Sequence, residues 1–191
     1  MRIVLVKHAQ PVLDGSRPAR DWELGAEGEQ QAVRLAGALE RFAPFRLVSS
    51  PEPKAARTAA LVAGQLGIVM DTIGDLRELD RPVLPILPAA EHQRLNARVF
   101  AARDEAVLGA ESASAALARF TAAIRTEMVR ASGQNLVAMS HGTVISLLVG
   151  ACNPVDAFEV WQRLQCPSFV VLDGPSLALI DVVDSVAQRY P

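Results

Sequence analysis

Short apolar runs alternate with longer segments of helical periodicity along this chain. Residues 2–6 and 136–139 are apolar runs of strand length, whereas residues 27–42 and 112–131 carry apolar side chains at helical spacing. An alternation of strands and helices is typical of sheets that are covered by helices. The order therefore predicts an α/β protein, a three-layer α/β/α sandwich with a mostly parallel central sheet.

The remaining elements follow the same pattern, with one interruption. Prolines at positions 82, 85 and 88 exclude a regular helix over residues 81–88 and indicate a loop or the edge of a cap. We therefore expect a single domain over residues 1–191, with a short cap or insertion around residues 79–109. Gly67 is expected to end the helix before it. Further strands are expected at residues 46–48, 68–70, 168–173 and 178–183, and further helices at 53–65, 89–106 and 143–151.

Composition excludes several classes of function. Half of the 191 residues are apolar, which is enough for a substantial core, and the formal charge of −2 shows no basic surplus. The apolar stretch at residues 3–6 is too short for a signal peptide, and the run at 144–152 is shorter than the roughly 20 residues that span a bilayer. We expect no nucleic-acid partner, no membrane association and a cytoplasmic location.

The cysteines and histidines show no metal-binding pattern. Cys152 and Cys166 fit neither a CxxC pair nor a zinc knuckle, so both are expected to be reduced thiols. The three histidines belong to no HExxH motif and have no carboxylate at ligand spacing. We therefore expect no metal.

Two of the histidines occupy equivalent places. His8 and His141 each directly follow an apolar run that is expected to be a strand. In open α/β sheets, ligands bind beyond the carboxyl ends of the strands, so this placement predicts one shared cleft with histidine chemistry. His92 lies in a helical stretch with arginine and glutamate, and is expected to be a solvated surface residue. Its alternative role is a substrate contact from the cap.

Three segments at predicted strand ends carry the motifs of the chain. They are residues 5–9 (LVKHA), 48–59 (VSSPEPKAARTA) and 139–145 (MSHGTVI), with Leu76-Arg77-Glu78 between the second and the third. In this order they resemble the histidine phosphatase superfamily, also called the phosphoglycerate-mutase-like family. The resemblance covers nearly the whole chain and implies that family's fold. Further matching positions are Leu24, Gly28, Gln31, Ala32, Glu111, Ser112 and Arg119.

The chain departs from the family pattern at three positions. Members usually carry Arg-His-Gly at the first motif and an arginine at position 54, whereas this chain has Lys7, Ala9 and Lys54. Lysine keeps the charge but loses the planar fork that grips two phosphate oxygens. Arg57, one helical turn beyond Lys54, could partly substitute if its side chain reaches the pocket. Ala9 would be strained if that position needs a positive φ.

The resemblance implies a cofactor-independent and metal-independent reaction on a small phosphorylated substrate. Cleavage of a phosphate monoester spreads negative charge over the phosphoryl oxygens, so positioning and cationic groups supply most of the catalysis. His8 would be the nucleophile that forms a phosphohistidine. Lys7, Lys54 and a protonated His141 would hold the phosphoryl oxygens. The amino ends of the helices after Ser50 and after His141 would add backbone N–H donors, with Gly142 among the residues that bind the substrate.

The leaving alkoxide needs a proton, and the resemblance assigns the acid and base role to Glu78. Asp80 is the alternative. It lies two residues after Glu78, and in an extended segment the side chains of residues two apart point to the same side. Ser49 and Ser50 lie in no GxSxG motif, so helix capping accounts for them better than nucleophilic catalysis.

Three functions remain open. The short cap favours hydrolysis, and the leading function is therefore a histidine acid-type phosphatase that hydrolyses a small phosphate monoester. The second is a phosphoglycerate mutase-type phosphotransferase, and the third is a catalytically weak relative that binds a phosphorylated ligand. The presence of His8, His141 and Glu78 together weighs against the third. Trp22 and residues 17–20 are expected at the entrance, and an apolar face on the last strands could support a homodimer.

Overall fold

The computed structural model describes residues 1–82 and 85–190 and contains one six-stranded sheet with the strand order β3-β2-β4-β1-β5-β6. Strands β1 to β4 run parallel, whereas β5 is antiparallel to β1 and β6 is antiparallel to β5. The mostly parallel sheet is confirmed. The strands are β1 (Arg2–Lys7), β2 (Phe45–Ser49), β3 (Met70–Thr72), β4 (Asn135–Ser140), β5 (Ser168–Asp173) and β6 (Leu179–Val183).

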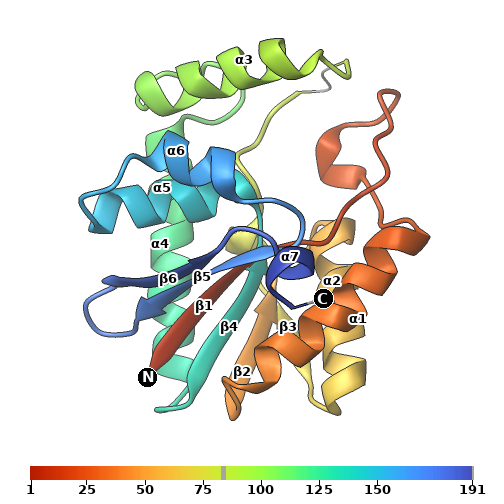
Figure 1. Ribbon diagram of the computed structural model, residues 1–191. Helices are drawn as coiled ribbons and strands as arrows, with labels where there is room; N and C mark the ends of the chain where they lie inside the picture. Colours follow the sequence, from red (N-terminus) through yellow and green to blue (C-terminus); the bar gives the residue numbers. More distant parts are fainter. Residues whose placement is uncertain (83–84, 191) are drawn as a thin grey trace.

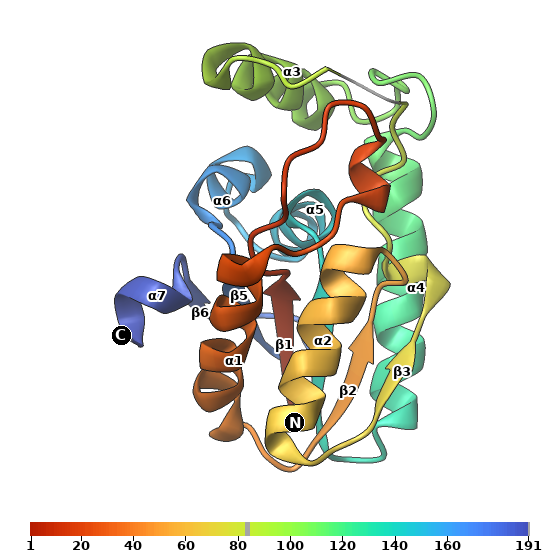
Figure 2. The same ribbon diagram turned by 90° about the vertical axis from the view of Figure 1, so that its right-hand side faces the viewer.

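Helices cover both faces of this sheet, as the α/β/α prediction requires. Helices α1, α2 and α7 lie on one face, and α4 and α5 lie on the other, with α6 packed on α5 (Figures 1 and 2). The α-helices are α1 (Ala26–Glu40), α2 (Pro53–Leu66), α3 (Ala89–Ala101), α4 (Ala113–Arg130), α5 (Gly142–Cys152), α6 (Ala157–Arg163) and α7 (Val186–Arg189), and two 3-10 turns are η1 (Ala19–Asp21) and η2 (Gly74–Leu76).

Strand β1 is buried on both faces of the sheet, and this explains why it is apolar at every central position. Ile3 and Leu5 belong to the core under α4 and α5, whereas Val4 and Val6 belong to the core under α1 and α2. Successive side chains of a strand point to opposite faces, so a strand buried on both faces needs apolar residues throughout. The same burial explains the apolar run of β4.

The carboxyl ends of β1, β2 and β4 meet at one edge of the sheet. Lys7 pairs with Ser140 across β1 and β4, and the pairing continues past the strands, because the N–H of His8 donates to the Ser140 carbonyl at 3.1 Å. The N–H of Ser50 likewise donates to the Met139 carbonyl at 2.9 Å. The segments that follow these three strands, which begin at His8, Ser50 and His141, therefore lie side by side at this edge of the sheet.

The cap consists of α3 and the segments that flank it. Its helix packs on α6 through aromatic rings, with His92 and Trp161 at 5.6 Å between centroids and Phe100 and Phe158 at 5.7 Å. The described residues of the proline-broken segment, 81–82 and 85–88, have no regular secondary structure, and positions 83–84 lie outside the described residues.

Several predicted boundaries shift. The cap helix ends at Ala101 rather than at residue 106, because Ala102 leaves the helical conformation. Gly67 ends α2 with a φ of +63°, as predicted, but β3 begins at Met70 rather than at residue 68. The reason is that the N–H of Ile68 still donates to the Ala63 carbonyl at the end of α2. Helix α6, which was not predicted, starts where the Asp156 side chain accepts from the Glu159 N–H.

No helix in the described part of the chain combines the length and the apolar character needed to cross a bilayer. Cys152 and Cys166 are both free thiols. The homodimer stays a prediction.

Two glycines of α1 allow a matched test of the packing between this helix and the chain after β1. A Cβ on Gly28 would lie 2.2 Å from the carbonyl oxygen of Gln10, whereas a Cβ on Gly37 would meet nothing within 4 Å. We expect Gly28→Ala to lower the free energy of unfolding by about 1–3 kcal/mol, and Gly37→Ala to raise it by about 0.5–1 kcal/mol. Urea unfolding of both variants measures this, and equal effects at the two positions would contradict the close approach.

Candidate active site

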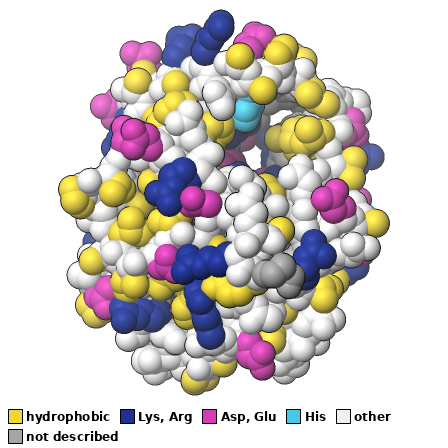
Figure 3. All heavy atoms as spheres, in the orientation of Figure 1, with side chains coloured by type: hydrophobic (Ala, Val, Ile, Leu, Met, Phe, Trp, Pro, Cys, Tyr) yellow, Lys and Arg dark blue, Asp and Glu magenta, His cyan; other side chains and the backbone are white. Residues whose placement is uncertain are grey.

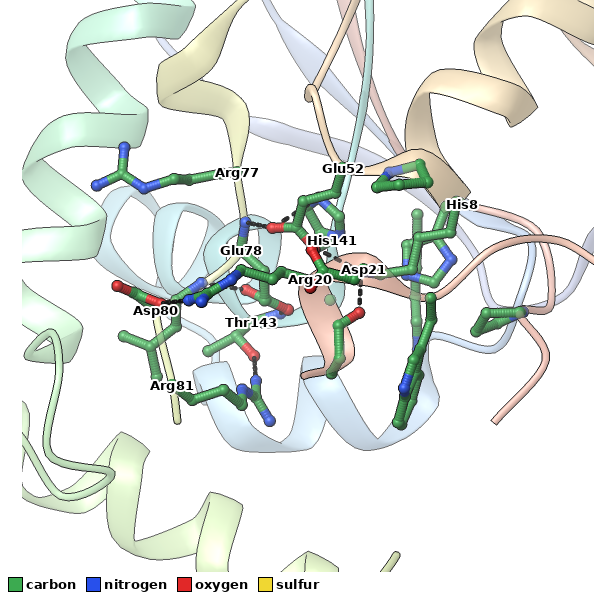
Figure 4. Close-up of a pocket in the computed structure, with 18 of the residues that line it drawn as sticks. His8, Arg20, Asp21, Glu52, Arg77, Glu78, Asp80, Arg81, His141 and Thr143 are labelled. Carbon is green, nitrogen blue, oxygen red and sulfur yellow. Dashed lines mark hydrogen bonds and ion pairs between the residues drawn. The ribbon is translucent and has the colours of Figure 1, made fainter. Parts of the chain in front are cut away.

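A cavity of about 400 Å³ opens at the edge of the sheet where β1, β2 and β4 end, and it is covered by the cap. The face of the molecule in Figure 3 is hollowed beneath the cap helix. The side chains that line the cavity come from the ends of β1 and β4, the start of α2, the loop after η2 and the cap (Figure 4). The predicted site residues that line it are Lys7, His8, Lys54, Glu78, His141 and Gly142.

His8 is buried on the cavity wall with a defined tautomer. Its Nδ1 lies 2.8 Å from the carbonyl oxygen of Ala9, which can only accept, so Nδ1 carries the proton and Nε2 keeps its lone pair. Burial, then the nearby His141 and the charge of Lys54, hold the pKa of His8 well below its ordinary value. Ala9 is not among the residues with a positive φ, so the expected strain does not arise. The ring is therefore neutral and has a free nitrogen for attack.

His141 lies against His8, with the two ring centroids 5.2 Å apart in an edge-to-face arrangement. Its Nε2 shares a hydrogen bond of 2.8 Å with the Ser50 hydroxyl. Burial, followed by the charge of Lys54, lowers the pKa of His141 to about 3. The ring is therefore neutral in the free site, because removing it from water disfavours its charged form. The protonated His141 is expected with phosphoryl oxygens bound to it, and that expectation stays a prediction.

Ser50 does not cap α2 in the expected way. The N-cap residue of α2 is Glu52, and no side chain caps this helix end. The Ser50 hydroxyl instead accepts from the Glu52 N–H at 3.2 Å and contacts His141. Ser49 donates its hydroxyl proton to the Ser50 carbonyl at 2.9 Å. Both serines thus shape the turn that presents α2 to the cavity.

Lys54 is buried, and its charge is paired within the protein. Its Nζ donates to the carbonyl of Ala19 at 2.7 Å and to Oε2 of Glu52 at 2.5 Å. The sequence reasoning missed Glu52, which is 8% exposed and lines the same cavity. The only available signal was an acidic residue two positions before Lys54 in the second motif.

Lys7 reaches the cavity from the end of β1. Its Nζ donates to the carbonyl of Leu164 at 2.7 Å. A Cβ on Gly142 would lie 3.4 Å from Cε of Lys7 and 3.5 Å from the Trp161 ring. These are ordinary van der Waals distances, so Lys7 and Trp161 pack directly against the start of α5.

The Glu78 carboxylate lies at the amino end of α5. One oxygen accepts from the N–H of Thr143 at 3.0 Å, and the other accepts from the N–H groups of Val144 at 3.2 Å and Leu79 at 2.9 Å. A carboxylate at this end of a helix is favoured by the helix dipole. The backbone donors of α5 that were expected to bind an anion are thus partly used by Glu78.

Arg119 of α4 fixes the loop that carries Glu78. Its guanidinium donates to the carbonyls of Asp75, Arg77 and Glu78 at 2.8, 3.0 and 3.2 Å. It also grips both carboxylate oxygens of Glu111, at 2.9 and 2.8 Å. One cation therefore ties three successive parts of this loop, Asp75, Arg77 and Glu78, to α4.

Charged side chains also lie around the rim. Asp80, the alternative acid, pairs with Arg20 at 3.1 Å. Arg81 lines the cavity and donates to the Thr143 hydroxyl at 3.3 Å, and it is a further cation that the sequence reasoning missed. The suggestion that Arg57 reaches the pocket is wrong, because Arg57 pairs with Glu29 outside it.

The predicted entrance and cap contacts lie at the same cavity. Trp22 and Arg20 line it, and the Trp22 indole N–H donates to the Asp14 carbonyl at 2.8 Å. His92 also lines it, against Trp161, so its geometry fits the alternative role of a cap contact. Within the described residues, no three His, Cys, Asp or Glu side chains are placed to hold a metal ion.

The mostly parallel sheet and the two histidines that meet at its strand ends agree with the fold and the shared cleft that the resemblance implied. Residues 3–172 match the histidine phosphatase superfamily (branch 1), and the chain belongs to this superfamily. The expected resemblance is confirmed.

Relatives and solved structures support this assignment. A probable phosphoglycerate mutase GpmB of Salmonella paratyphi A is 27% identical over 157 residues, which cover 78% of this chain and 73% of that protein. The structure of a mycobacterial glucosyl-3-phosphoglycerate phosphatase with VO3 superposes with a TM-score of 0.77 at 26% identity, covering 96% of this chain and 98% of that one. The structure of TTHB049 from Thermus thermophilus gives a TM-score of 0.67 at 26% identity, with coverages of 96% and 98%.

The depressed pKa of His141 makes stability depend on pH. Above the ordinary value of 6.5 the ring is neutral in both the folded and the unfolded chain, whereas below it only the unfolded chain gains the proton, until pH reaches the folded value of about 3. Acidification from pH 7.5 to 5 should therefore remove on the order of 2 kcal/mol through this residue.

Urea unfolding at both pH values measures the loss. The variant His141→Gln should show a shallower dependence than the natural chain, and His92→Gln should change the slope less, because His92 is only partly buried. Identical slopes for the natural chain and His141→Gln would contradict a neutral buried His141.

Proposed function

We propose that this protein is a phosphatase that hydrolyses a small phosphate monoester through a phosphohistidine on His8. The observation that carries the proposal is the tautomer of His8. The Ala9 carbonyl holds the proton on Nδ1, which leaves a nucleophilic Nε2 on the wall of a cavity lined by cationic side chains. A nucleophile fixed in this way needs no further base, because it is already neutral.

In the first step, Nε2 of His8 attacks phosphorus and the bond to the leaving oxygen breaks. Lys7, Lys54 and Arg81 supply positive charge for the phosphoryl oxygens, and the N–H of Gly142 at the start of α5 adds a donor. A bound phosphoryl group places negative charge beside His141 and so favours its protonated form. His141 can then donate a proton to a phosphoryl oxygen.

In the second step, water attacks the phosphohistidine. Glu78 is the group proposed to enter the first step as the carboxylic acid, to give its proton to the leaving oxygen there, and then, as the carboxylate that remains, to take a proton from this water. The N–H groups of Thr143 and Val144 fix the orientation of its carboxylate, and Arg119 fixes its loop. The proposal thus uses one positioned carboxyl group in both steps.

The short cap supports hydrolysis over phosphoryl transfer between two positions of one substrate. A mutase has to retain its phosphorylated intermediate, and the cap here is limited to the single helix α3 and its flanking segments. The related proteins point to the substrate class, because one is a probable phosphoglycerate mutase and another is a glucosyl-3-phosphoglycerate phosphatase. We propose phosphorylated hydroxy acids as the first substrates to test. A carboxylate of the substrate would meet Arg20 and Arg77, which line the cavity and whose present partners are Asp80 for Arg20 and Asp75 and Glu111 for Arg77.

Removal of the nucleophile is the first test. We expect His8→Ala to lower kcat for p-nitrophenyl phosphate by at least about 1,000-fold, with chelator present and no metal added. The natural chain, quenched during turnover, should carry an acid-labile phosphoryl group that intact-mass measurement detects and His8→Ala should lack. His92→Ala is the control and should still be phosphorylated. A fully active His8→Ala protein would contradict the mechanism.

Glu78→Gln separates the two chemical steps. Nitrophenolate is a weak base that leaves without a proton, so a burst of nitrophenol should remain while the later turnover falls by about 10²–10⁴-fold. With an alkyl phosphate, whose leaving oxygen needs a proton, Glu78→Gln should lose both the burst and the later turnover. Asp80→Asn, which removes only the pair with Arg20, should stay within a few-fold of the natural chain. A larger loss in Asp80→Asn than in Glu78→Gln would reassign the acid.

Incubation with 3-phosphoglycerate distinguishes hydrolysis from transfer. The proposal expects inorganic phosphate as the product. A phosphorus NMR spectrum that shows 2-phosphoglycerate and no free phosphate would support the mutase alternative. Phosphate binding without either product would support the catalytically weak relative.

A further inference from the structure

Glu52 is a buried carboxylate on the wall of the cavity that the proposed reaction does not use. Its side chain is 9% exposed and projects from the N-cap position of α2 toward the loop that carries Glu78 (Figure 4). The family resemblance assigns no role to this position. A negative charge inside a site for phosphoryl groups needs a physical account, because it repels the ligand that the neighbouring cations attract.

The surroundings of Glu52 are those of a bound anion. Its Oε2 accepts from Nζ of Lys54 at 2.5 Å, and its Oε1 accepts from the N–H of Glu78 at 2.7 Å. The same Oε1 lies 3.5 Å from Nε2 of His141. A phosphoryl group held between His8 and His141, whose rings are 5.2 Å apart, would therefore lie next to this carboxylate.

The Glu52 carboxylate can accept further hydrogen bonds but cannot donate any. Each carboxylate oxygen has two lone pairs, of which one is used by the bond to Lys54 or to Glu78. A ligand that has only acceptor oxygens cannot bond to Glu52 and is repelled by it. A phosphoryl group that carries a proton can donate its O–H to the carboxylate, and such charge-assisted bonds are short and strong.

We propose that Glu52 makes this pocket selective for phosphoryl groups that carry a proton, and therefore selective against sulfate groups, which carry none. The inference rests on the proposed phosphoryl site. Phosphate monoesters lose their last proton near pH 6, at about the value known for phosphorylated side chains. The protonated form that Glu52 accepts is thus abundant from mildly acid to neutral pH.

Calorimetric titration with inorganic phosphate and with sulfate, at about pH 6, tests this selectivity without turnover. The natural chain should bind phosphate at least about tenfold more tightly than sulfate, the effect of one hydrogen bond to a charged group. In Glu52→Gln, whose amide can donate to sulfate, the ratio of the two affinities should fall to about threefold or less through a gain in sulfate binding.

Two further variants make the comparison specific. Glu52→Leu removes both the charge and the acceptor, and it should lose the discrimination in the same way. Glu29→Gln is the matched control, because Glu29 also pairs with a cation of α2, Arg57, at 2.7 Å, but outside the cavity. It should keep the ratio of the natural chain.

The inference and the proposed function can fail separately. A natural chain that binds sulfate as tightly as phosphate would overturn the inference, and so would an unchanged ratio in both Glu52 variants; hydrolysis through His8 would stand in either case. Absence of phosphate binding in the natural chain would overturn the inference together with the phosphoryl site. The ratio in the natural chain is decisive even if one Glu52 variant fails to fold.

Discussion

The parallel pairing of β4 between β1 and β2 is the constraint on which the site depends. The ladder continues one residue past the strands, where His8 donates to Ser140 and Ser50 donates to Met139. The residues after the three strands are therefore positioned by main-chain hydrogen bonds and by cores that are closed on both faces. His8, His141 and the start of α2 come together because these strands end at the same edge.

Charge pairing inside the cavity shows how the lysines are accommodated. A buried charge is costly unless it is paired or hydrogen-bonded, and each lysine here donates to a main-chain carbonyl, Lys7 to Leu164 and Lys54 to Ala19. Lys54 also has Glu52 as its counter-ion. A lysine ammonium has three donors on one atom, so it can bond to a carbonyl and a carboxylate and still present a third donor.

The sequence allowed the sheet and the placement of the two histidines to be predicted, because burial on both faces leaves an apolar run in β1 and β4, and each histidine follows one of these strands. The role of Glu78 was predicted from the family resemblance alone. The sequence did not allow the state of the side chains to be predicted. Arg57 lies one turn from Lys54, yet Glu29 of another helix binds it. Glu52 was given no role in the sequence analysis, and its second partner, the N–H of Glu78, is brought to it only where the start of α2 meets the loop of Glu78.

The protonation of His141 illustrates the same limit and links the two carboxylates to the ligand. Burial lowers the pKa of the free ring to about 3, whereas the resemblance implies a protonated ring that holds the phosphoryl oxygens. The two statements describe different states of the pocket, because an anionic ligand beside the ring favours its charged form. Under the proposed mechanism, phosphoryl binding is accompanied by proton uptake at His141, and the charge of the ligand acts on a neutral histidine on one side and on the Glu52 carboxylate on the other, whose Oε1 lies 3.5 Å from Nε2 of His141.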